Sequence, residues 1–228
     1  MFIPLHDNNP LNVIRFQVVT VGLLVTNIAI FLWVHFEVSG QREIVSVLSF
    51  GVIPVELISN KTTAYPSTPM FEGLTLFTYM FFHAGWMHLI GNMLFLWVFA
   101  DNVEDSMGHW RFLVFYLACG IAAGLVHAVM SGGSAAPLVG ASGAVAGVLG
   151  AYLVLYPKAR VWVLILFRIP LRIPAYWALG GWIALQFFEV YMSSDDSNVA
   201  WWAHIGGFAT GILLVFVIRK HHAIRQPT

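Results

Sequence analysis

Residues 140–156 read GASGAVAGVLGAYLVLY, an apolar run that contains no charged residue and has Ser142 near its start. A second apolar run, residues 199–218, carries His204. Polar and ionisable groups inside helices of membrane-spanning length are costly, so they indicate function by default. A hydroxyl and an imidazole in two such runs therefore predict a reaction that takes place inside a membrane.

The composition also favours a membrane protein. Of the 228 residues, 59% are hydrophobic and only 10% are charged, whereas a soluble globular domain has about 25% charged residues. Lys and Arg total 11, as do Asp and Glu, so the chain offers no electrostatic case for binding nucleic acid. The N-terminal residues lack a basic segment followed by a short apolar core, and we expect no cleavable signal peptide.

Six segments meet or approach the roughly 20 apolar residues that a membrane-spanning helix needs. They are residues 16–36, a part of 73–100, 112–130, the short 141–156, 173–191 and 199–218. Residues 161–167 are apolar but too short to cross, which indicates an interfacial or buried connector. Because no long polar insertion separates the segments, the sequence predicts one all-α bundle of six transmembrane helices, with residues 1–228 forming a single domain.

The distribution of basic residues predicts the direction of threading. With the N-terminus in the cytoplasm, nine Lys and Arg residues fall on the inner side and two on the outer side, a clear positive-inside bias. Both termini are therefore expected in the cytoplasm, and residues 37–72 form the largest outer loop. The inner residues are Arg15, Arg111, Lys158, Arg160, Arg168, Arg172, Arg219, Lys220 and Arg225; the outer ones are Arg42 and Lys61.

This threading places four polar residues at one depth. The second, fourth and sixth segments all run from outside to inside, and His88, Asn92, Ser142 and His204 lie near their starts. At 1.5 Å rise per residue, all four fall within about 10 Å of the outer surface. Packing residues would be scattered in depth, so this convergence predicts a single site.

The four residues suit nucleophilic catalysis. A neutral imidazole such as His204 can accept the proton of the Ser142 hydroxyl near pH 7. His88 and Asn92 are four residues apart, so they share one helical face, and both can donate hydrogen bonds to an oxyanion, as can the backbone N–H of Ser142. We therefore expect a Ser–His dyad.

No carboxylate is evident as the third member of a triad with Ser142 and His204. Asp101, Glu104 and Asp105 fall about 20 Å below the serine by helical rise, which excludes them as direct partners. Glu189 is the only carboxylate near the right depth, and it is a weak candidate.

Glycines accompany both members of the dyad. Gly143, Gly147 and Gly150 follow Ser142, and Gly206, Gly207 and Gly211 follow His204. Small residues at such spacing let two membrane helices approach closely. A hydrogen bond of about 3 Å between Ser142 and His204 would need that close approach.

Three motifs together resemble the rhomboid family of intramembrane serine proteases. They are Gly140-Ala141-Ser142-Gly143, His88-Leu89-Ile90-Gly91-Asn92 and Ala203-His204-Ile205-Gly206-Gly207. The resemblance covers roughly residues 73–219, which would form the core, with 1–15 and 220–228 as cytoplasmic tails. Each motif alone is weak, but their order and common depth make the combination specific.

The resemblance implies both a mechanism and partners. Ser142 would attack the scissile carbonyl, His204 would act as base and then acid, and Asn92, His88 and the Ser142 N–H would stabilise the oxyanion. No metal or other cofactor is implied. The substrates would be single-span proteins of a cell membrane, plasma or inner, cut near the outer end of their transmembrane segment, within the lipid bilayer.

One position departs from the family. Many members carry an aromatic residue four positions after the serine, where it packs on the catalytic imidazole, but this chain has Ala146. Support for His204 would then fall to Trp201, Trp202 or another aromatic residue. His83 matches a position that the family often fills with histidine, and we interpret it as structural.

Three other functions compete with this interpretation. A proteolytically inactive relative could bind transmembrane segments, although it would not need both Ser142 and His204. A small transporter could use the histidines as a relay, but the sequence offers no inverted repeat. His83, His88 and His204 could bind zinc, but neither a HExxH motif nor an accompanying carboxylate supports such a site.

Overall fold

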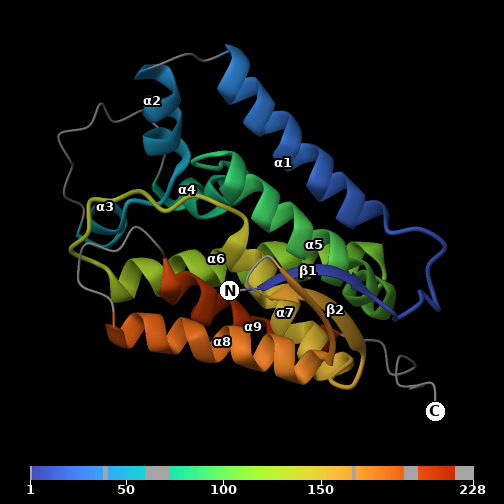
Figure 1. Cartoon of the computed structure of the whole chain (residues 1–228). Coiled ribbons are helices and arrows are strands. Elements are labelled where there is room, and N and C mark those ends of the chain that lie inside the picture. Colours follow the sequence, from blue (N-terminus) through green and yellow to red (C-terminus); the bar gives the residue numbers. More distant parts are fainter. Residues whose placement is uncertain (1, 38–40, 60–71, 166–167, 193–199, 219–228) are drawn as a thin grey trace.

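The computed structural model describes residues 2–37, 41–59, 72–165, 168–192 and 200–218. Most of them lie in helices (Figure 1). In chain order the elements are β1 (Phe2–Asp7), α1 (Val18–Glu37), α2 (Gln41–Phe50), α3 (Pro54–Ser59), α4 (Glu72–Thr78), the short 3-10 helix η1 (Tyr79–Phe81), α5 (Trp86–Met107), α6 (His109–Met130), α7 (Ser142–Leu155), β2 (Arg160–Ile165), β3 (Ile169–Pro174), α8 (Ala175–Met192) and α9 (Trp201–Ile218).

Several helices are suited to a bilayer. Within the described residues, α1, α6 and α9 are each long and apolar enough to cross a membrane. Residues 72–81 and α5 pass the same test together but are bent by 80°, so that counting this pair as one span gives up to four spans in the described part of the chain. The protein is thus a largely helical membrane protein. The second expected segment is not one straight helix, because the chain turns between η1 and α5.

Helix α7 forms the centre of the bundle. Residues 143–152 are all buried, and α7 contacts α5, α6, α8 and α9. A helix that is covered on every side has no polar face, which explains why this segment is apolar throughout. Its 14 residues are too few for a lipid-exposed span, but its surroundings are protein.

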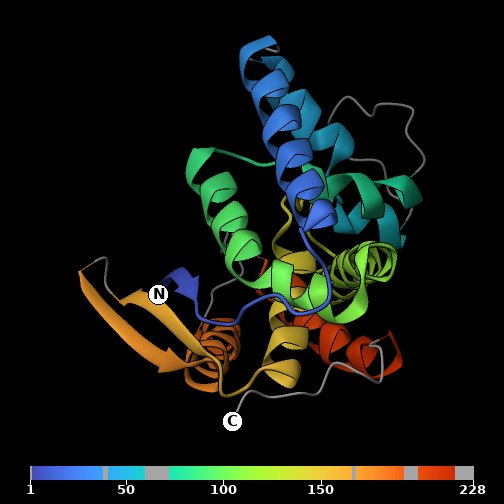
Figure 2. The same ribbon diagram turned by 90° about the vertical axis from the view of Figure 1, so that its right-hand side faces the viewer.

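The expectation of an all-α fold is wrong in one respect. Residues 160–165 form β2, the central strand of a three-stranded antiparallel sheet with the order β1-β2-β3. Residue 2 pairs with residue 165, and residue 160 pairs with residue 174. The segment 161–167, interpreted as a connector, is therefore largely a strand, and alternate residues Val161 and Val163 are buried. The sheet lies beside α8 at the flank of the bundle (Figure 2).

The segment assigned to an N-terminal tail is also structured. Residues 2–7 form β1, and β1 contacts α5 as well as β2. The corresponding C-terminal tail, residues 220–228, lies outside the described residues.

Acidic side chains near the end of α5 hold this N-terminal segment in place. Asp105 accepts the backbone N–H groups of Asn12, Val13 and Ile14 at 2.7–2.9 Å. Glu104 accepts the N–H of Val19 and both the N–H and hydroxyl of Thr20 at 2.6–3.0 Å. The first N–H groups of a helix have no partner within it, so Glu104 caps α1.

Candidate active site

A cavity of about 400 Å³ surrounds Ser142. Helices α5, α7, α8 and α9 contribute to its wall, as do the loops before α5, α7 and α9. The residues that line it are Ala84, Met87, His88, Gly91, Asn92, Phe95, Pro137, Leu138, Val139, Ser142, Val145, Leu149, Trp182, Ala200 and His204. All four residues that the sequence placed at one depth therefore meet in one cavity.

Ser142 is the first residue of α7, and the loop before it has an unusual backbone. Gly140 has φ +120°, a conformation that side chains rarely adopt. A Cβ at Gly140 would lie 2.5 Å from the ring of His88. The glycine therefore lets His88 lie directly over the chain that leads to the serine.

The same loop is held from two other directions. The N–H of Gly140 donates to the carbonyl of Tyr79 at 2.9 Å, and the N–H of Ala141 donates to His83 Nε2 at 3.5 Å. His83 is buried, and its ring lies 5.2 Å from that of His88. These contacts agree with the interpretation of His83 as a structural residue.

Asn92 provides a hydrogen-bond donor that has no acceptor. Its side chain is buried, yet its Nδ2 makes no hydrogen bond with any described residue. Buried donors are nearly always paired, so each exception needs an explanation. The Ser142 N–H, at the start of α7, likewise has no partner within its helix. Both the Asn92 Nδ2 and the Ser142 N–H can donate a hydrogen bond to an oxyanion.

His204, on α9, is supported from α8. The ring of Trp182 lies 5.6 Å from the imidazole, and the ring of Trp201 lies 6.1 Å away at a steep angle. Gln186 Oε1 lies 2.7 Å from His204 Nδ1. The aromatic support that Ala146 cannot give thus comes from Trp182 and Trp201, which answers the question raised by the departure at that position.

Glycines bring α7 and α9 into backbone contact. A Cβ at Gly207 would lie 2.0 Å from the carbonyl oxygen of Gly143, and one at Gly211 would lie 2.0 Å from that of Gly147. Any larger residue would push the helices apart. The expected close approach is therefore present.

No direct hydrogen bond joins Ser142 to His204 among the described residues. Both side chains nevertheless face the same cavity, and catalytic hydrogen bonds are often long in structures without substrate.

Gln186 was not among the residues predicted from the sequence, because only carboxylates were considered as a third partner. Glu189, the candidate that was weighed, lies on the same helix. A signal was available, because Gln186 is a polar residue in an apolar segment at a depth similar to that of His204. None of the three acidic residues excluded on grounds of depth, Asp101, Glu104 and Asp105, lines the cavity.

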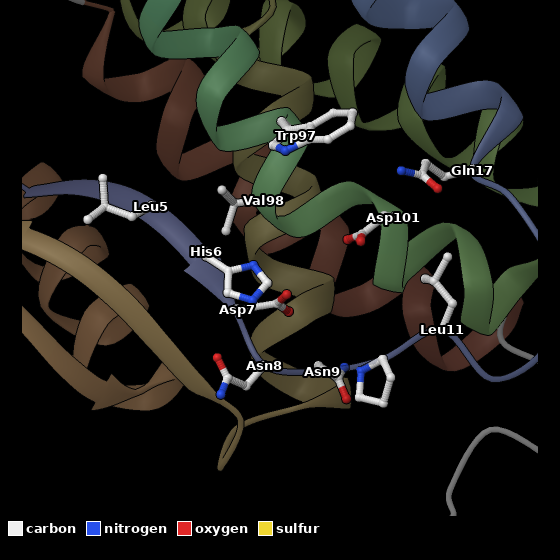
Figure 3. A pocket seen from close by; sticks show the side chains of 11 residues that line it. Leu5, His6, Asp7, Asn8, Asn9, Leu11, Gln17, Trp97, Val98 and Asp101 are labelled. Atoms are coloured by element: carbon white, nitrogen blue, oxygen red, sulfur yellow. The ribbon is translucent and has the colours of Figure 1, made fainter.

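A second cavity, of about 560 Å³, lies between the N-terminal segment and α5 (Figure 3). Asp7 and Asp101 are the acidic residues in its wall. The Asp7 carboxylate accepts a hydrogen bond from Tyr152 Oη at 2.5 Å and one from Asn102 Nδ2 at 3.3 Å. The polar groups of this cavity hold the N-terminal segment in place. The described residues in the wall of the cavity include no serine or cysteine nucleophile.

The Rhomboid domain family matches residues 71–221, which is more than half of the chain. The chain belongs to the rhomboid family. It is 34% identical to the rhomboid protein YdcA of Bacillus subtilis over 150 residues, 64% of this chain and 67% of that protein. It is 28% identical to rhomboid protease GlpG of Klebsiella pneumoniae over 167 residues, 69% of this chain and 54% of GlpG.

A plant relative whose name places it in the chloroplast is also similar. The chain is 34% identical to Rhomboid-like protein 11, chloroplastic, of Arabidopsis thaliana over 150 residues, 63% of this chain and 51% of that protein. The rhomboid chain therefore spans about two thirds of YdcA and about half of GlpG and of the chloroplast protein. GlpG is named as a rhomboid protease, whereas the chloroplast protein is named only as rhomboid-like.

Proposed function

We propose that this rhomboid protein is an intramembrane serine endopeptidase that uses Ser142 as nucleophile and His204 as general base and acid. The cavity that contains Ser142, His204, His88 and Asn92 supports this proposal most directly. Their convergence beside the unpaired Asn92 Nδ2 favours a site that stabilises a developing oxyanion.

The roles of the residues follow from their chemistry. The Ser142 hydroxyl attacks the scissile carbonyl while His204 Nε2 takes its proton, and the same proton is later given to the leaving amine. The negative oxygen of the intermediate accepts hydrogen bonds from Asn92 Nδ2, a nitrogen of His88 and the backbone N–H of Ser142. Donors aimed at that oxygen are worth about 10²–10³ each in kcat.

The substrate is proposed to be the transmembrane segment of a single-span protein. Because a helix pairs its own backbone groups in the bilayer, its scissile carbonyl becomes accessible only where the helix unwinds, so segments weakened by Gly, Pro or Ser are preferred. We also propose six crossings with both termini in the cytoplasm, an arrangement that would put the cavity near the outer face of a cell membrane. The bias of basic residues supports this orientation.

Cleavage of a single-span reporter in proteoliposomes tests the assignment. We expect Ser142→Ala and His204→Ala to reduce cleavage by at least about 10³-fold. Thermal denaturation in the same detergent should show both variants folded, and Thr26→Ala, which changes an exposed hydroxyl on α1, should cleave normally. Full activity of either variant would refute the mechanism.

A catalytically inactive rhomboid protein that binds transmembrane segments is the second candidate. One relative of this chain, the chloroplast protein of Arabidopsis thaliana, is named only as rhomboid-like. A fluorophosphonate probe, which modifies activated serines, separates the two functions. Labelling that disappears in Ser142→Ala supports an enzyme, whereas binding of the reporter without labelling or cleavage supports the inactive protein.

A further inference from the structure

We infer that Gln186 completes the dyad as a positioning residue, holding His204 in the tautomer and orientation that the reaction requires. This inference rests on the proposed function and assigns a role to a residue that does not touch substrate. It starts from the contact between Gln186 Oε1 and His204 Nδ1 at 2.7 Å.

The amide of Gln186 can be oriented in only one way. Its Nε2 lies 3.2 Å from the backbone carbonyl of Trp182, and a carbonyl can only accept a hydrogen bond. The Nε2 group must therefore face Trp182, which leaves Oε1 facing His204. Since Oε1 can only accept, the His204 Nδ1 must carry the proton.

This chain of hydrogen bonds defines the state of the imidazole. A neutral imidazole protonated on Nδ1 has a lone pair on Nε2. The lone pair is then free to accept the proton of the Ser142 hydroxyl as its oxygen bonds to the carbonyl carbon. That proton passes to the leaving nitrogen when the peptide bond breaks, while the Nδ1 proton stays on the ring throughout.

A carboxamide fits this place better than a carboxylate would. Gln186 is 3% exposed, and an unpaired carboxylate is costly to bury. Gln186 and Trp182 are four residues apart on α8, so one face of that helix supplies both the acceptor for Nδ1 and the ring that packs on the imidazole. The face of α8 replaces the aromatic residue that is absent at Ala146.

Gln186→Met tests the role, because methionine has a similar volume but no acceptor for the Nδ1 proton. We expect kcat to fall roughly 10- to 100-fold with KM unchanged, since general-base catalysis is worth about 10²–10⁴. Thr210→Val is the matched control. It removes a hydrogen bond within α9, between Thr210 and the carbonyl of Gly206, and should leave both constants within about twofold.

Gln186→Glu distinguishes positioning from packing. A carboxylate keeps the acceptor and stabilises the imidazolium, so this variant should recover most of the lost kcat at about pH 8 and move the acidic limb of the pH–rate profile to higher pH. If Met and Glu reduce kcat equally and the profile stays in place, Gln186 only packs and the inference is wrong.

Histidine ¹⁵N NMR gives a readout that is independent of activity. In a Ser142→Ala background, the His204 signals, identified by their loss in His204→Ala, should report protonation on Nδ1. In Gln186→Met this preference should weaken. An unchanged tautomer, or unchanged kcat in Gln186→Met while Ser142→Ala is inactive, overturns the inference but not the proposed function. Only retained cleavage in Ser142→Ala would refute the latter.

Discussion

Asn92 and Asn102 lie on the same helix, α5, and are both buried, yet their surroundings are opposite. Asn102 accepts a hydrogen bond from Asn9 and donates to Asp7 and Asp101. The Nδ2 of Asn92 donates to no described residue. A buried polar group that is fully paired stabilises the fold, whereas one that is left unpaired lowers stability unless a ligand uses it. We call the hydrogen bonds that Asn102, Glu104 and Asp105 of α5 make with residues 7–20 the junction. The junction and the cavity around Ser142 thus use an asparagine side chain for different purposes.

Replacing each asparagine by alanine gives the largest expected contrast. Asn92→Ala should lower kcat about 10²–10³-fold, because it removes an oxyanion donor, and should not lower the thermal midpoint, because it removes an unpaired buried group. Asn102→Ala should lower stability by about 1–3 kcal/mol and leave kcat of the folded fraction unchanged. The comparison fails if Asn92→Ala lowers the midpoint while cleaving the reporter normally.

Glu104 tests whether the junction acts only on stability. Glu104→Ala leaves the N–H groups of Val19 and Thr20 without their acceptor. It also removes the contact between Glu104 Oε1 and His109 Nδ1, which lie 2.5 Å apart. We expect a loss of about 2–3 kcal/mol in the free energy of unfolding, measured by denaturation in detergent. The fluorophosphonate labelling rate of the folded protein should not change. A lower labelling rate would show that the junction and the cavity are coupled.

The contact between α7 and α9 beside the cavity predicts that alanine at two different glycines changes the stability in opposite directions. Gly207→Ala forces a Cβ against the carbonyl of Gly143 and should cost about 1–3 kcal/mol of stability. It should also reduce cleavage by separating His204 from Ser142. Gly181→Ala, on α8, meets nothing within 4 Å and should stabilise the helix by about 0.5–1 kcal/mol. Equal midpoints for the two variants would contradict the close approach of α7 and α9.

The smallest effect is a dependence of stability on pH in the junction. Burial raises the pKa of the Asp7 carboxyl from 3.8 to about 7, although the hydrogen bond from Tyr152 opposes this shift. The folded protein therefore keeps a proton that the unfolded chain releases. This contribution to stability is complete below about pH 4 and is lost as the pH rises through about 7.

Asp7→Asn removes the titrating group and keeps the shape. The thermal midpoint of the natural protein should fall between about pH 4 and pH 7, and the variant should show a smaller fall. Parallel curves for the two proteins would mean that Asp7 is already ionised in the fold.

The motifs predicted much of the cavity, because depth along a helix follows directly from residue counting. Ser142, His88, Asn92 and His204 needed only the helical rise and the order of the segments. The segments also agree with the helices, since α6, α7, α8 and α9 begin and end within a few residues of the expected limits.

The remaining features depend on contacts between distant residues. The break before α5 follows from the placement of η1 and the Ser142 loop, which hydropathy does not encode. The pairing of β1 with β2 joins residues 2–7 to 161–165, and no local pattern reveals such a partner. Gln186 was overlooked for a chemical reason, because only groups that can carry charge were considered as partners of the imidazole.

The pairing of β1 with β2 has a consequence for biosynthesis. Residues 2–7 leave the ribosome well before their partner strand, because α1 to α7 lie between β1 and β2 in the chain. The nascent chain must therefore keep its first strand unpaired until β2 emerges, a contact of very high sequence separation that is slow to close. The sheet therefore forms late in folding, and β1, although synthesised before the helices, is among the last elements to reach its final place.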